Sequence, residues 1–217
     1  MAARTAPVAS RALLTPNQRA LIARRLDACA AIALATAGIA LLAMLASYDP
    51  MDPSLNTATG RRAANWFGGP GAATADALLQ GFGLAGALPG LALLGWAWRL
   101  ASHRGLGRVS MRILALIVAL PLAGAALAAI PVPPGVLPPG GAIGSVLADA
   151  VAIRVDALLG PIGSAAAWVA GAALALGASW WALGLSAREW IGAKRGMRAG
   201  LDGARAALSA GAGGLSG

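Results

Sequence analysis

Very few residues in this chain could do chemistry, and they are far apart. The sequence contains one histidine, His103, one cysteine, Cys29, and one lysine, Lys194. A zinc centre needs about four ligands of these types, and a Ser-His-Asp site needs an acid and a serine that a histidine can reach. A phosphate-binding G-x-x-x-x-G-K-[ST] loop is also absent, because Lys194 is followed by Arg195. The sequence therefore predicts no catalytic, cofactor-binding or metal site, and His103 is interpreted as a solvated loop residue.

The residues that could carry a function are polar and aromatic side chains in two segments between long apolar stretches. They are Asp52, Asn65, Trp66, Asp76 and Arg154, and we expect them to form an interface for protein partners. The alternative is local turn and cap chemistry, since an acid near a helix start also favours the helix dipole. Arg154 could equally snorkel to a lipid headgroup or pair with a nearby acid. The sequence leaves both interpretations open.

Four long stretches without a charged residue must position these side chains. They cover 28–47, 77–98, 113–130 and 157–187. A helix rises about 1.5 Å per residue, so roughly 20 apolar residues cross a hydrocarbon core about 30 Å thick. The chain is 58% hydrophobic and 12% charged, whereas a soluble domain carries about 25% charge. We therefore predict an all-α membrane protein with four transmembrane helices, at about 26–47, 75–98, 111–130 and 163–185.

The basic residues predict how the spans are oriented. The net charge is +9, and 14 of the 17 basic residues lie in the N-terminal segment, the middle loop and the tail. The remaining three, Arg61, Arg62 and Arg154, lie in the other two loops. Because basic loops stay on the cytoplasmic side, both termini are predicted to be cytoplasmic. The first span is too long for the 7–15-residue apolar core that is typical of a cleaved signal peptide.

The composition divides the chain into three parts. We expect a cytoplasmic N-terminal segment at 1–25, a four-span membrane domain at 26–187, and a basic cytoplasmic tail at 188–217 that begins a linker. The last residues are rich in Gly, Ser and Ala, which is typical of flexible linkers. This end predicts that the sequence is part of a longer protein.

One further helix is expected in the second outer loop, at about 142–159. Ser145, Asp149 and Asp156 fall on one stripe of this helix and apolar residues fall on the opposite stripe. This pattern predicts an amphipathic helix that lies on the outer membrane surface or packs on the other spans.

Small residues and prolines predict how the spans pack. Gly86 with Gly90, and Ala167 with Gly171, have the four-residue spacing that lets helices approach closely. We expect these residues to support helix packing and self-association. Pro89 is predicted to kink the second span at its middle.

Four stretches in the right order carry a family resemblance. They are Tyr-Asp-Pro-Met-Asp-Pro-Ser at 48–54, the Asn-, Gly- and Asp-containing segment at 65–76, Gly-Gly-Ala-Ile-Gly-Ser-Val-Leu at 140–147, and the end of the fourth span near 179–194. With the four spans between them, they make the chain similar to the N-terminal membrane domain of FtsK/SpoIIIE-type DNA translocases. The resemblance covers about residues 26–195.

The resemblance implies an anchor and scaffold in the bacterial inner membrane at the division septum. The implied partners are membrane lipid, other cell-division proteins and further copies of the chain. Double-stranded DNA, ATP and Mg²⁺ would be bound only by a RecA-like motor that is absent from this sequence, so the chain itself is expected to be neither an enzyme nor a cofactor-binding protein. The alternatives are a small transporter or channel subunit, which needs polar groups along a path, and a lipid enzyme, which needs reactive groups at the interface.

Overall fold

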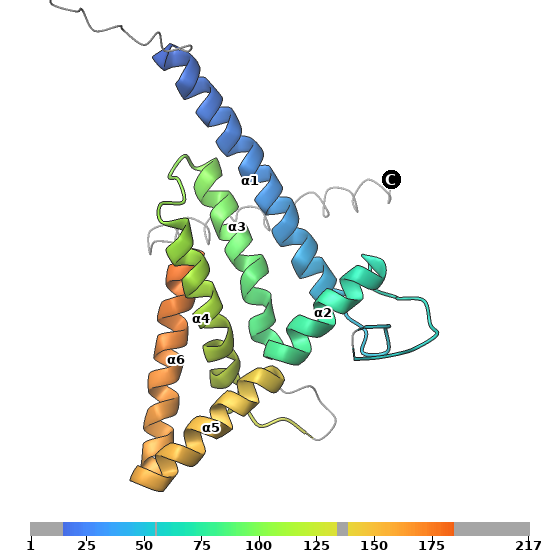
Figure 1. The fold of residues 1–217 in the computed structure, drawn as a ribbon, viewed down its shortest axis with the longest axis vertical. Helices are drawn as coiled ribbons and strands as arrows, with labels where there is room; N and C mark the ends of the chain where they lie inside the picture. The colour runs from blue at the N-terminus through green and yellow to red at the C-terminus, as the bar shows by residue number, and fades with distance from the viewer. Residues whose placement is uncertain (1–14, 55, 134–138, 185–217) are drawn as a thin grey trace, which may run out of the picture.

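The computed structural model describes residues 15–54, 56–133 and 139–184, and within them every regular element is helical (Figure 1). The elements are α1 (Pro16–Ala46), α2 (Gly68–Phe82), the 3₁₀ helix η1 (Gly83–Ala87), α3 (Leu88–Ala101), α4 (Val109–Ala128), α5 (Gly141–Leu159) and α6 (Pro161–Leu183). The basic tail at 188–217 lies outside the described residues.

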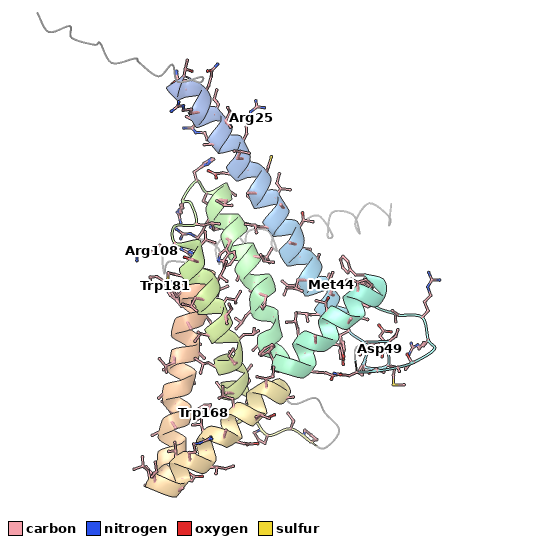
Figure 2. All side chains as sticks on the ribbon, in the orientation of Figure 1. Arg25, Met44, Asp49, Arg108, Trp168 and Trp181 are labelled. Atoms are coloured by element: carbon pink, nitrogen blue, oxygen red, sulfur yellow. The ribbon has the colours of Figure 1, made fainter. Side chains whose placement is uncertain are left out.

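Four helical segments are long and apolar enough to cross a membrane. They are Asn17–Ala46, Gly68–Ala101, Val109–Ala128 and Ile162–Leu183. Figure 2 shows Arg25 and Arg108 toward one end of the bundle and Asp49 toward the other. Following the charge pattern, we call the end with Asp49 the outer end. The all-α, four-span prediction is confirmed.

The first helix begins with a capping box formed by Thr15 and Gln18. The Thr15 hydroxyl accepts a hydrogen bond from the backbone of Gln18 at 3.3 Å, and the Gln18 side chain accepts one from the backbone of Thr15 at 2.9 Å. Pro16 follows in the first turn, where its missing N–H costs nothing. With 31 residues, α1 is about 46 Å long, so it extends beyond α3 at its inner end (Figure 1).

The second span differs from the prediction, because it is broken. Residues 68–101 form α2, the short η1 and α3, and α2 runs obliquely to α3 (Figure 1). The break begins at Gly83, whose φ is 59°, and the next amide, that of Leu84, donates to the carbonyl of Pro139 at 2.9 Å. Pro89 lies in the first turn of α3. The kink predicted at Pro89 is therefore wrong, and the chain bends several residues earlier.

The long helices lie in a row in the order α1, α3, α4 and α6, while α2 and α5 run obliquely across their outer ends (Figure 1). Helix α1 packs on α3, α4 packs on α6, and α2 meets α5. Close approach of α1 and α3 depends on two glycines. A methyl group on Gly38 would lie 2.9 Å from the carbonyl oxygen of Gly90, and one on Gly90 would lie 2.8 Å from the Leu42 side chain.

A second set of close contacts joins the two halves of the row at the outer end. We call it the outer glycine node, and it consists of Gly83, Gly124, Gly140, Gly141 and Gly144. A methyl group on Gly141 would lie 2.5 Å from the Gly83 nitrogen, and one on Gly124 would lie 2.9 Å from the Gly140 oxygen. Backbone therefore meets backbone where η1, α4 and α5 come together.

Candidate functional site

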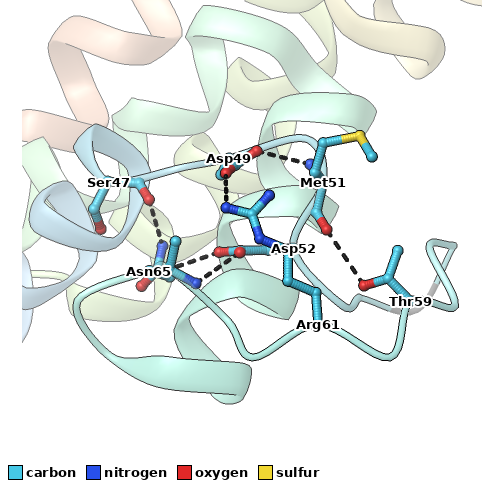
Figure 3. A network of polar contacts seen from close by, with 8 residues as sticks. Ser47, Asp49, Met51, Asp52, Thr59, Arg61 and Asn65 are labelled. Atoms are coloured by element: carbon cyan, nitrogen blue, oxygen red, sulfur yellow. Dashed lines mark hydrogen bonds and ion pairs between the residues drawn. The ribbon is translucent and has the colours of Figure 1, made fainter.

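The outer loop between α1 and α2 is organised around a buried carboxylate. Asp52 is 3% exposed. One carboxylate oxygen accepts from the backbone of Ala64 at 2.7 Å and the other accepts from the backbone of Asn65 at 2.9 Å (Figure 3). Hydrogen bonds to a charged acceptor are the stronger kind. Asp52 therefore ties the beginning of the loop to its end.

Asn65 joins the end of α1 to the beginning of α2. Its side-chain amide donates to the carbonyls of Met44 at 2.8 Å and Ser47 at 3.2 Å, and its oxygen accepts from the backbone of Phe67 at 3.0 Å. The last carbonyls of a helix have no partner within the helix. The buried Asn65 side chain, 4% exposed, therefore satisfies the C-terminal end of α1 while it holds the turn before α2.

The turn that these contacts fix presents two aromatic side chains. The backbone of Trp66 donates to the Ser47 hydroxyl at 3.3 Å, and the backbone of Gly68 donates to the Asn65 carbonyl at 2.8 Å. The Trp66 side chain is nevertheless 75% exposed and Phe67 is 42% exposed. Hydrogen bonds thus hold the backbone of residues 66–68, while the side chains of Trp66 and Phe67 stay exposed. We call Trp66 and Phe67 the aromatic turn.

A second buried carboxylate, Asp76 on α2, is held by Tyr48, which follows α1, and by Gln80 of α2. One oxygen accepts from the Tyr48 hydroxyl at 2.9 Å and from the side-chain amide of Gln80. The Gln80 oxygen in turn accepts from the side chain of Asn56 at 3.2 Å. These side chains connect α2 to the outer loop.

Burial raises the pKa of the Tyr48 phenol above its ordinary value of 10.0, and the hydrogen bond with Gln80 lowers the pKa by a smaller amount than burial raises it. The hydrogen bond to Asp76 and the charges of Asp76 and Asp49 raise the pKa further. The phenol therefore stays protonated near neutral pH and remains a donor to Asp76.

The surface of the loop carries a weaker ion pair. Arg61 lies 3.3 Å from a carboxylate oxygen of Asp49, and the two side chains are 53% and 31% exposed. The same aspartate accepts from the backbone of Met51 at 2.9 Å (Figure 3). An exposed pair of this kind contributes about 0–1 kcal/mol, so the loop depends mainly on Asp52, Asn65 and Asp76.

The structure separates the five predicted interface residues into two groups. Asp52, Asn65 and Asp76 are buried and bonded within the chain, which supports the turn-and-cap alternative for these three. Trp66 is exposed, and so is Arg154, which donates to the carbonyl of Ala150 at 2.8 Å. A role in contacting partners stays a prediction for these two exposed residues.

The predicted packing residues also have different surroundings. Gly90 lies against α1, whereas a methyl group on Gly86 would lie 2.8 Å from the Leu78 carbonyl oxygen of the preceding helix. On α6, a methyl group on Gly171 would have no neighbouring atom within 4 Å. Gly171 and Ala167 instead line a groove of about 440 Å³ between α4, α5 and α6. We call it the α4–α6 groove.

Sequence reasoning missed a cluster at the inner end. Arg99, in the last turn of α3, donates to the carbonyl of Gly184 at 2.7 Å. The indole of the buried Trp96 donates to the carbonyl of Ala182 at 2.7 Å. Both acceptors belong to the C-terminal end of α6, which carries partial negative charge. The only available signal was the basic character of the middle loop, which predicts the orientation of the spans and not this contact.

Within the described part of the chain, no three His, Cys, Asp or Glu side chains gather as a metal site. Cys29 is exposed on α1, and His103 is exposed in the loop after α3 with a φ of 54°.

Comparison with known proteins gives consistent matches. The family described as the 4TM region of DNA translocase FtsK/SpoIIIE matches residues 23–192. A protein of Azospirillum brasilense named DNA translocase FtsK is 36% identical over 207 residues, which is 90% of this chain and 32% of that protein. The protein of the same name from Bradyrhizobium diazoefficiens is 33% identical over 186 residues, covering 81% of this chain and 22% of the relative.

A third protein of that name, from Agrobacterium fabrum, is 36% identical over 140 residues, 64% of this chain and 15% of its own length. The chain thus spans at most about a third of these curated relatives. No solved structure matches the chain at a significant level.

Replacing Asp52 tests whether its carboxylate holds the two ends of the outer loop together. Asp52→Ala leaves the amides of Ala64 and Asn65 without their acceptor, and each unsatisfied buried group costs about 1–3 kcal/mol. We expect a clear fall in thermal stability in detergent and faster proteolysis of the outer loop. Arg61→Ala removes only the exposed pair with Asp49 and should change stability by less than about 1 kcal/mol. Equal effects of the two variants would contradict this assignment.

The single tyrosine of the chain allows a direct titration. Since the folded pKa of Tyr48 is raised, its stabilising contribution is present below pH 10 and is lost as the pH rises through the folded pKa. Phenolate absorbance should therefore show a midpoint above 10 in the folded protein. Asp76→Asn should lower that midpoint, while the distant Asp149→Asn should not. A midpoint at or below 10 in the unmodified protein would show that the phenol is not held as described.

Proposed function

The chain belongs to the family of the 4TM region of DNA translocase FtsK/SpoIIIE, and from this premise we propose that it is the membrane anchor and scaffold of a DNA translocase in cell division and chromosome segregation. The observation that carries the proposal is the family match at residues 23–192, which includes most of α1 and all the other helices. The ATPase motor is proposed to lie outside the residues of this chain, so ATP, Mg²⁺ and DNA would be bound there.

The inner end of α6 suits the role of an anchor. Arg99 of α3 holds the carbonyl of Gly184, and Trp96 holds that of Ala182. A pull on the chain beyond α6 would therefore act on α3 as well as on α6. Because α1 and α4 pack on these two helices, the force would be shared among all four spans.

The outer end suits the role of a scaffold. The aromatic turn is exposed while its backbone is fixed by Ser47 and Asn65. Exposed aromatic residues on a rigid support are favourable anchors for a protein partner, because little conformational freedom is lost on binding. We propose that cell-division proteins meet the chain here, on the outer side of a bacterial inner membrane, while both termini are cytoplasmic.

A fluorescent fusion to the chain tests this function in dividing cells. We expect the fusion to gather at the division septum and Trp66→Ala to weaken that enrichment while the protein stays in the membrane. Trp181→Ala removes another exposed tryptophan, 60% exposed near the inner end of α6, and should leave the enrichment unchanged. An even distribution of the parent fusion around the cell membrane would contradict a septal role.

Asp76→Ala should weaken recruitment or membrane insertion as well, since it removes the acceptor of Tyr48 and Gln80. In a full-length translocase the same change should leave ATPase activity unaltered. Normal division at a normal protein level in this variant would show that Asp76 is needed neither for recruitment nor for membrane insertion.

A further inference from the structure

The α4–α6 groove is an opening between helices that residues 15–54, 56–133 and 139–184 leave unfilled. It is lined mostly by small residues of α4, α5 and α6, among them Ala126, Ala148, Ala167 and Gly171. Because lipid tails are as apolar as the helices, close packing against small residues is a main source of helix association in membranes. A groove of this kind fits a row of larger aliphatic side chains from another helix.

Helix α1, at the opposite edge of the molecule from α6 (Figure 1), exposes two isoleucines on one face. Ile32 and Ile39 are 68% and 61% exposed, and with the exposed Thr36 they occupy one face, since residues four and three positions apart lie one above the other. The face that packs on α3 is a different one and contains Gly38. Within the described part of the chain, α1 and α6 make no contact, so α1 cannot reach the groove of its own chain.

The two surfaces lie at the same distance from the outer ends of their helices. Gly171 lies ten residues from the outer end of α6 at Pro161, and Thr36 lies ten residues from the outer end of α1 at Ala46. Both positions are therefore roughly 15 Å from the outer ends of their helices.

Charges beside the two surfaces are complementary. Asp149 of α5 lines the groove, is exposed, and has Asp156 on the same stripe of its helix. Arg62, exposed in the loop that follows α1, makes none of the ion pairs found in the described residues. Arg154 lies on the opposite stripe of α5 and is not among the residues that line the groove.

In the loop between α1 and α2, Asp49 pairs with Arg61 and Asp52 is bonded to backbone amides. The exposed Arg62 is therefore the charge beside α1 that can meet the exposed acids beside the groove.

We infer that the α4–α6 groove receives α1 of a second copy of this chain, with Arg62 of that copy beside Asp149. The contact is head to tail, because it joins different surfaces of the two copies, and repetition of such a contact closes into a ring when the rotation permits. The inference rests on the proposed scaffold role and names the surface through which the scaffold assembles.

Cysteine cross-linking between two differently tagged chains in bacterial membranes tests the contact. In a Cys29→Ser background, one chain carries Thr36→Cys and the other carries Gly171→Cys. A short bifunctional thiol reagent should give a mixed dimer that contains both tags. The matched control replaces Gly171→Cys by Val169→Cys, at nearly the same depth on the other side of α6 and 59% exposed, and should give several-fold less dimer.

The charge pair provides a second measurement on the same samples. Arg62→Glu should lower the yield of mixed dimer, and Asp149→Arg in the other chain should restore it. Arg154→Glu should have no effect. Equal yields at positions 169 and 171, or no mixed dimer from chains that remain in the membrane pellet, would overturn the inference and leave the anchor role standing. Loss of the chains from the membrane pellet would overturn both.

Discussion

Backbone contact at the outer glycine node is the constraint on which the rest of the structure depends. In lipid, helices gain little by hiding apolar surface from one another, and they associate through close packing. Gly124 of α4 faces Gly140 and Gly144 at the start of α5, and Gly141 faces Gly83. Side chains at these positions would separate α4 from α5 and α5 from η1. The same contact ends α2 at Gly83 and thereby turns one long apolar stretch into an oblique outer helix and a span.

Because α2 lies across the outer ends of the spans, the backbone groups between α1 and α2 need polar partners from nearby side chains. The carbonyls at the end of α1 and the amides before α2 lie near lipid, where an unsatisfied backbone group is costly. Asn65 and Asp52 satisfy them, and Asp76 holds Tyr48 and Gln80 in the same region. The buried acids and amide therefore act through the residues they support. What they support is the aromatic turn, whose Trp66 and Phe67 side chains are exposed.

The sequence predicted the spans well because apolar length and charge are local properties. The cap at Thr15 and the helix from Gly141 to Leu159 were likewise visible in local patterns. The break at Gly83 was not, since the Pro139 carbonyl that stabilises it lies far along the chain. The burial of Asp76 depends on Tyr48, 28 positions away, and Arg99 meets Gly184 85 positions away. A loop acid has the same appearance in sequence whether it points outward or inward.

The most direct measurement compares two glycine substitutions in helices by thermal unfolding of the purified chain in detergent. Gly144→Ala places a methyl group against the backbone of Gly124, and overpacking of this kind costs about 1–3 kcal/mol. Gly177→Ala fills open space and gains up to about 1 kcal/mol of helix propensity. The account predicts a lower midpoint for Gly144→Ala and an unchanged or higher one for Gly177→Ala. Equal stability of the two variants would contradict the central role of the node.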